Sequence, residues 1–120
     1  MARVVHFEIP SADPEKASAF YRDLFDWEIQ DAGVGMPYFL AKTGEESPGI
    51  DGAIMGNDGT AKTVVNTIGV ESLEASLAKV QELGGQVVTD VTPIPNVGRF
   101  AYCKDLDGNL FGVLQPEMPG

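Results

Sequence analysis

The feature that most constrains the fold of this chain is an internal duplication. Val4-Val5-His6 recurs as Val64-Val65-Asn66, and Gly52-Ala53-Ile54-Met55 aligns with Gly112-Val113-Leu114-Gln115, both at an offset of 60 residues, from 6 to 66 and from 52 to 112. We therefore interpret residues 1–120 as one domain made of repeats 1–60 and 61–120. Half of such a domain cannot bury its helix alone, so the two repeats are expected to share one architecture.

Each repeat has the same predicted order of elements, one strand, one helix and three strands. In the first repeat Asp13 is the expected N-cap and Pro14 the first residue of a helix over 14–25; the second helix is expected to end at Gly84–Gly85. The predicted strands are 4–10, 27–30, 37–42, 52–56, 62–70, 86–91, 99–104 and 109–115. The segment TPIPNVG is expected to be a loop, because its two prolines cannot donate ladder hydrogen bonds. This order, βαβββ twice, predicts an α+β fold whose curved mixed sheet surrounds a cleft, with the helices on the outer face.

Alternation along each strand predicts which side chains face the cleft. On the first strand Val5, Phe7 and Ile9 are expected in the core, which leaves His6 and Glu8 facing the cleft. Asn66 is the counterpart of His6 at the offset of 60. A turn at Asp105–Gly108 would pair Lys104 with Asn109 and Ala101 with Gly112, with Phe100, Tyr102, Phe111 and Val113 under the helix. The predicted ligand-binding residues are therefore His6, Glu8, Asn66, Arg99, Ala101, Leu110 and Gly112.

His6, the only histidine, has two interpretations. It is either a hydrogen-bonded residue that holds the two halves together, or a proton acceptor and ligand contact. In the second case His6 and Glu8 are the predicted catalytic residues, with Glu8 fixing the tautomer of His6 or raising its pKa. Arg99 is a candidate partner for Glu8 or for an anionic group of a ligand. The aromatic residues Trp27, Tyr38 and Phe39 are expected at the mouth of the pocket or in packing.

The composition of the chain limits the classes of partner that it is expected to bind. The net charge of −10 disfavours nucleic acid and anionic membrane surfaces, and it would attract a cationic ligand or simply keep the protein in solution. No apolar stretch approaches the roughly 20 residues that cross a bilayer, and the N-terminus lacks a secretory signal pattern. One cysteine, Cys103, cannot form an internal disulfide, which fits a cytoplasmic location.

Several segments resemble the vicinal oxygen chelate superfamily, which includes glyoxalase I, bleomycin-resistance proteins and extradiol dioxygenases. They are HFEIPSADPEKASAFYRDLFDW, the LGG after the second helix and VGRFAYCKDLDGNLFGVLQP, together with the tandem βαβββ order. Within the superfamily the chain is similar to the branch of predicted enzymes related to lactoylglutathione lyase. The resemblance covers essentially the whole chain and implies a glyoxalase-like fold and a homodimer.

The resemblance also implies where a metal would bind. Active members hold one divalent ion through positions that correspond to His6, Gly52, Asn66 and Gly112. Only His6 carries a good ligand, because an amide is a weak one and glycine has no side chain; Glu8 would add a second. Zinc, nickel or iron needs about three to four donors. A divalent metal is therefore disfavoured, and no cofactor is expected.

Three hypotheses about function follow. The first is a small-molecule-binding protein with a degenerate metal site. The second is an enzyme, either a metal-dependent lyase, isomerase or dioxygenase or a metal-free acid–base catalyst that uses His6 and Glu8. The third is a drug-sequestering protein of the bleomycin-resistance type, whose acidic surface attracts a cationic drug.

Overall fold

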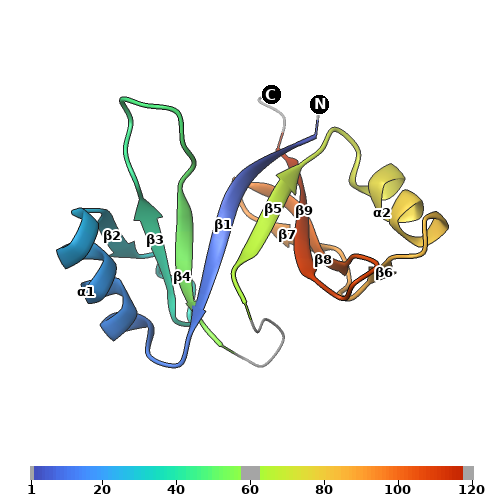
Figure 1. Cartoon of the computed structure of the whole chain (residues 1–120). Helices are drawn as coiled ribbons and strands as arrows, with labels where there is room; N and C mark the ends of the chain where they lie inside the picture. The colour runs from blue at the N-terminus through green and yellow to red at the C-terminus, as the bar shows by residue number, and fades with distance from the viewer. Residues whose placement is uncertain (1, 58–62, 118–120) are drawn as a thin grey trace. The chain divides into compact units, whose positions relative to one another are not determined.

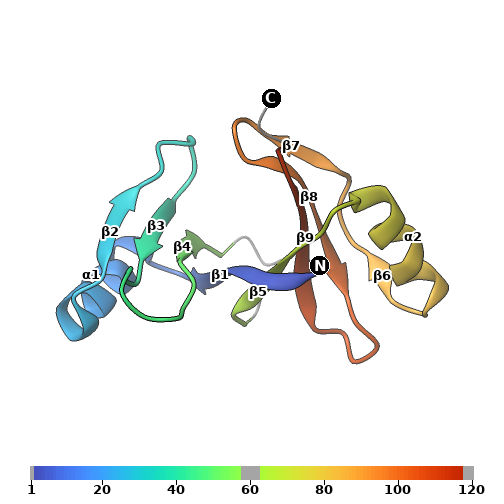
Figure 2. The same cartoon turned by 90° about the horizontal axis from the view of Figure 1, so that it is seen from above.

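The structure is a computed structural model that describes residues 2–57 and 63–117. Its contacts divide the chain into two compact units, one within His6–Val65 and the other within Asn66–Gly120 together with Met1–Val5. In each unit the helix lies along one side of that unit's own strands (Figures 1 and 2). Among the described residues, no helix is both long enough and apolar enough to cross a membrane.

The first unit contains one helix and the strands β2-β3-β4-β1, in that spatial order. Its elements are β1 (Arg3–Ser11), which belongs to this unit from His6 onward, α1 (Pro14–Phe25), β2 (Glu28–Asp31), β3 (Tyr38–Lys42) and β4 (Gly52–Gly56). Helix α1 begins as predicted, with Pro14 in its first turn and the Asp13 carboxylate accepting a hydrogen bond from the backbone N–H of Lys16. It ends at Asp26, whose φ of 64° is left-handed and stops the helix.

The second unit repeats this plan with one additional strand. Its elements are β5 (Val65–Gly69), α2 (Leu73–Glu82), β6 (Gln86–Val87), β7 (Thr92–Ile94), β8 (Gly98–Lys104) and β9 (Leu110–Pro116). The strand order is β5-β9-β8-β6, and β7 also pairs with β8. Leu73 of α2 packs with Cys103 and Val113 in a buried core. A βαβββ unit followed by a second one with β7 added confirms the predicted α+β class.

The extra strand β7 corrects one prediction. Residues 92–94 were expected in a loop, yet Thr92 pairs with Phe100 and Pro93 with Arg99 in an antiparallel ladder. A proline is tolerated on an edge strand, where its nitrogen needs no partner strand. The two prolines therefore limit the length of this strand without preventing it.

The predicted register of the last hairpin is wrong by one residue. Lys104 pairs with Leu110 and Ala101 with Val113, not with Asn109 and Gly112. The cause is Asp105, whose carboxylate accepts hydrogen bonds from the backbone N–H of Asp107 and of Asn109, and from the Asn109 side chain. Asn109 is thereby held in the turn, and every residue of β8 changes the face that we predicted for it.

The offset between structurally equivalent positions of the two repeats is also one residue shorter than the offset between their recurring sequence motifs. The N-caps of the two helices are Asp13 and Ser72, and Phe7 pairs with Gly52 as Asn66 pairs with Phe111. Equivalent positions thus lie 59 residues apart, from 13 to 72 and from 7 to 66. The structural counterpart of His6 is Val65, and that of Glu8 is Thr67.

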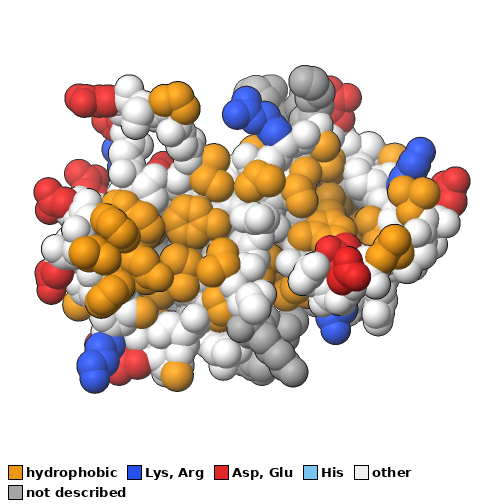
Figure 3. Space-filling view, viewed as in Figure 1, with side chains coloured by type: hydrophobic (Ala, Val, Ile, Leu, Met, Phe, Trp, Pro, Cys, Tyr) orange, Lys and Arg blue, Asp and Glu red, His pale blue; other side chains and the backbone are white. Residues whose placement is uncertain are grey.

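Apolar residues recur at helical spacing along α1, and the stripe that they form is only partly covered. Tyr21 stacks on Trp27 with ring centroids 5.2 Å apart, and Trp27 in turn contacts Phe7. Phe20, Leu24 and Phe25 remain more than half exposed, and Figure 3 shows apolar side chains gathered over this helix. The aromatic stack, rather than the whole stripe, fixes α1 against its sheet.

Packing around Gly52 gives a stability prediction. A Cβ atom at Gly52 would lie 2.5 Å from both the ring and the carbonyl oxygen of Phe7, and backbone cannot move aside as a flexible side chain can. Gly52→Ala is therefore expected to lower the free energy of unfolding by about 1–3 kcal/mol, measured by urea denaturation. Gly44→Ala is the matched control, because nothing lies within 4 Å of its Cβ position. Equal stability of the two variants would contradict this packing.

Candidate functional site

Three side chains of the first unit form a hydrogen-bonded group that we call the polar row: His6, Tyr38 and Glu8. The Tyr38 hydroxyl donates to Glu8 Oε2 at 2.7 Å, and its oxygen lies 3.0 Å from His6 Nε2. His6 and Glu8 lie on β1 and Tyr38 on β3, so the phenol reaches across β4, which separates these strands. The residue of β4 beside Glu8 is Ala53, whose short side chain leaves space for the phenol.

The polar row lies on the face of the sheet opposite α1. Phe7, between His6 and Glu8, contacts Trp27 on the α1 side, and neighbouring residues of a strand point to opposite faces. Glu8 is 6% exposed, a burial that a carboxylate tolerates when it accepts hydrogen bonds. The predicted placement of His6 and Glu8 on the face opposite Phe7 is therefore correct, and the structure brings His6 and Glu8 together through Tyr38. Val5, which we expected in the core, is 40% exposed instead.

Burial dominates the electrostatics of His6. Partial burial lowers the pKa of His6 below its ordinary value of 6.5, although the negative charges of Glu8 and Asp51 act in the opposite direction. The imidazole is therefore neutral at pH 7. A neutral imidazole carries one N–H donor and one acceptor nitrogen, which suits both hydrogen bonding and proton transfer.

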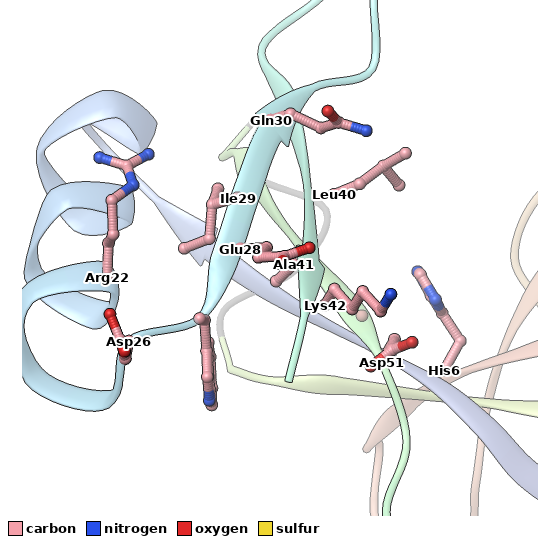
Figure 4. Close-up of a pocket in the computed structure, with 12 residues that line it drawn as sticks. His6, Arg22, Asp26, Glu28, Ile29, Gln30, Leu40, Ala41, Lys42 and Asp51 are labelled. Carbon is pink, nitrogen blue, oxygen red and sulfur yellow. The ribbon is translucent and has the colours of Figure 1, made fainter. Parts of the chain in front are cut away.

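A pocket of about 750 Å³ adjoins His6. Figure 4 shows His6, Lys42 and Asp51 gathered at one end of it. The Asp51 carboxylate is held by the backbone N–H and the hydroxyl of Thr43, at 2.9 and 3.2 Å, while Lys42 forms an ion pair with Glu45. Other charged or polar side chains that line the pocket are Arg22, Asp26, Glu28 and Gln30. The volume is within the range of about 300–1,000 Å³ typical of small-molecule sites.

Two of the predicted ligand-binding residues lie on the wrong face of the second unit. Arg99 and Ala101 were expected away from the helix, but the corrected register puts them on the α2 face of β8 with Cys103. Arg99 Nη2 donates to Glu74 of α2 at 2.8 Å and to Gln115 at 3.1 Å. The guanidinium is therefore engaged within its own unit and is not the partner of Glu8 that we predicted.

The remaining predicted residues of this unit divide between the two faces of the sheet. Leu110 and Gly112 alternate with Phe111, which packs in the α2 core, so they face away from the helix as predicted. Asn66 pairs with Phe111, whereas Thr67 pairs with Gly112 and lies beside its Cβ position. Thr67, not Asn66, thus shares the face of Gly112. Contact of His6 and Asn66 with one ligand stays a prediction.

Sequence reasoning missed Asp51 and Lys42, and it assigned Tyr38 only a place near the pocket mouth. Tyr38, Leu40 and Lys42 alternate along β3, so the pattern PYFLAK did contain a signal that these three share a face. Asp51 immediately precedes β4, one residue before the glycine that the resemblance selected. Its charge acts on His6 in addition to that of Glu8, so a second carboxylate near the imidazole comes from position 51.

The donor set does not fit the divalent ion that the resemblance implies. Gly52 shares the face of Phe7, not of His6, and it has no room for a side chain. A Cβ at Gly112 would lie 2.6 Å from the Phe100 ring. Residues 2–57 and 63–117 contain no cluster of three or more His, Cys, Asp or Glu side chains arranged to hold a metal. In addition, Nε2 of His6 is already hydrogen-bonded to the Tyr38 hydroxyl.

Comparison with known proteins identifies relatives of the chain. The family model of the Glyoxalase/Bleomycin resistance protein/Dioxygenase superfamily matches residues 3–113. A putative glyoxylase, CFP32 of Mycobacterium bovis, is 45% identical over 47 residues, which are 39% of this chain and 18% of that protein. This chain therefore corresponds to a small part of that relative. A glyoxylase-like domain-containing protein of Didymella fabae is 28% identical, with 88% of each chain covered.

A solved structure supports the fold assignment. A glyoxalase/bleomycin resistance protein/dioxygenase superfamily member from Vibrio splendidus 12B01 superimposes with a TM-score of 0.70. The superposition covers 98% of this chain and 100% of that one, at 17% identity. Both units of the present chain thus have counterparts in a fold already known from experiment.

The electrostatics of His6 give a pH prediction. Its titration midpoint, followed by NMR of its ring C–H signals, is expected below 6.5 because burial lowers the pKa. Asp51→Asn is expected to lower the midpoint further, since the negative charge of Asp51 favours the protonated ring. Asp23→Asn, an exposed change on α1, is the control and should leave the midpoint unchanged. An upward shift in the Asp51 variant would show that the assigned sign is wrong.

Proposed function

The chain belongs to the glyoxalase/bleomycin resistance protein/dioxygenase superfamily, and from this premise we propose that its first unit binds a small organic molecule without a metal ion. The observation that carries the proposal is the neutral, partly buried imidazole of His6 at the edge of a pocket of about 750 Å³. The apolar side chain of Leu40, which lies on the same face of the sheet as Glu8 and His6, supplies contact area there. His6, Asp51 and Lys42 supply the polar groups that orient a ligand.

A ligand screen with one pocket variant and one remote variant tests this proposal. Small organic molecules that raise the melting temperature of the protein would be titrated by calorimetry. His6→Ala is expected to weaken binding at least about tenfold, equivalent to about 1.4 kcal/mol. Arg99→Ala is the control, because Arg99 is bonded to Glu74 of α2 and is absent from this pocket. Equal affinities of the wild type and the His6 variant would refute the proposed site.

Chelation separates this proposal from the metal-dependent alternative. Binding measured after treatment with EDTA is expected to equal binding before it. If chelation abolished binding and added zinc, nickel, manganese or iron restored it, a metal-dependent lyase, isomerase or dioxygenase would replace the proposed function.

A metal-free acid–base enzyme is the second candidate, favoured by the hydrogen bonds that connect Glu8, Tyr38 and His6. A carboxylate that orients and polarises an imidazole through hydrogen bonds is a familiar way to make a general base. If His6 removes a proton from bound ligand, ligand incubated in D₂O should exchange a C–H for deuterium, as read by NMR. The exchange should be lost in His6→Ala and kept in Arg99→Ala. Equal exchange with and without protein would exclude this chemistry for the ligand tested.

Three further expectations belong with this proposal. The acidity of the chain, −10 in net charge, supports sequestration of a cationic drug as an alternative form of binding, for which a glycopeptide should raise the melting temperature when neutral ligands do not. Likeness to the superfamily supports a homodimer. The single cysteine supports a cytoplasmic location.

A further inference from the structure

The direction of the hydrogen bond between Tyr38 and Glu8 determines the state of His6. An ionised Glu8 has only acceptor atoms. Tyr38 has a single hydroxyl proton, which it donates to Glu8 Oε2 at 2.7 Å. The oxygen of Tyr38 can then serve His6 Nε2, 3.0 Å away, only as an acceptor. The proton between His6 and Tyr38 must therefore belong to Nε2.

The other ring nitrogen follows from this assignment. In a neutral imidazole that carries its proton on Nε2, Nδ1 has a free lone pair. Within residues 2–57 and 63–117, Nδ1 of His6 accepts no hydrogen bond. The ring borders the pocket, so an acceptor without a partner is available to a ligand there.

We infer that Glu8, acting through Tyr38, holds His6 as its Nε2–H tautomer, and that Nδ1 accepts a hydrogen bond from an N–H or O–H group of the ligand. The ligand class is therefore an amine, amide or alcohol, and not a carboxylate. This second statement rests on the proposed function, whereas the tautomer is a property of the free protein. Tyr38 is a positioning residue in this scheme, because it acts on the ligand only through His6.

The charges around His6 favour the same ligand class. Asp51 lies close enough for its charge to act on the imidazole, and Glu28 lines the pocket on the same face of the sheet as Lys42. Lys42, the cation on this face, is already paired with Glu45, whereas Arg22 lies on the α1 side. Acceptors and negative charge thus predominate, which attracts a donor group and repels a carboxylate.

The tautomer can be read without any ligand. The chain has one histidine, so protein labelled with ¹⁵N-histidine gives one pair of ring nitrogen signals in a long-range ¹H–¹⁵N spectrum. At a pH above the titration midpoint, Nε2 is expected to carry the proton and Nδ1 to be bare. Tyr38→Phe removes the acceptor and should yield a mixture of tautomers. Tyr21→Phe, which keeps its ring on Trp27, should not. A proton on Nδ1 in the wild type would overturn the inference.

Three matched probes test the ligand class: benzylamine, benzyl alcohol and benzoate. The amine and the alcohol are expected to shift the Nδ1 signal of the wild type, with at least about tenfold weaker titration midpoints in Tyr38→Phe. Benzoate should produce no shift. Tighter binding of benzoate than of benzylamine would overturn the ligand class. Binding of none of the three would count against the proposed function, while the tautomer measured in the free protein would still stand.

Discussion

The two-residue period of β1 is the constraint on which the rest of the first unit depends. Phe7 points toward α1 and contacts Trp27, which stacks on Tyr21 of the helix. Because Phe7 is anchored there, His6 and Glu8 must point to the opposite face. The same ring occupies the space above Gly52. A single aromatic side chain thus attaches the helix, excludes a side chain at position 52 and directs the imidazole and the carboxylate toward Tyr38.

Local signals predicted most of the elements, although the strand expected over 86–91 is only Gln86–Val87. Side-chain hydrogen bonds in a turn explain the main error. Helix α1 has the predicted bounds because Asp13 and Pro14 specify its start within the chain itself. The register of β8 and β9 depends instead on how many residues the turn consumes. The Asp105 side chain accepts a hydrogen bond from the backbone N–H of Asn109, which adds Asn109 to the turn. Short turn motifs in the sequence do not indicate this turn length. One residue of difference moved Arg99 and Ala101 to the helix face.

Only the part of the candidate site that lies on a single strand, β1, could be predicted from the sequence. Alternation in VVHFEIP places His6 beside Glu8 on one face, and the structure confirms this. Tyr38 is their partner because β4 lies between β1 and β3, a spatial order that no local pattern contains. Asp51 lies just outside β4, and the family resemblance selected Gly52, the next residue, in its place. The assignment of Asn66 as the counterpart of His6 failed for a related reason. Identical residues recur at an offset of 60, but structurally equivalent positions lie 59 residues apart, so the counterpart of His6 is Val65.

The charges near His6 are mostly negative, and this favours binding of a hydrogen-bond donor over a reaction in which negative charge develops on the ligand. A divalent ion would stabilise negative charge that develops on a bound oxygen. The polar row has the opposite effect, because the Glu8 carboxylate accepts a hydrogen bond from Tyr38, whose oxygen in turn accepts one from His6 Nε2. This increases electron density on the imidazole and makes Nδ1 a better acceptor. Asp51 adds to this negative potential, and Lys42 is paired with Glu45. An anion formed in this pocket would be destabilised, whereas a donated hydrogen bond would be strengthened. Binding of a donor group is for this reason placed ahead of proton abstraction.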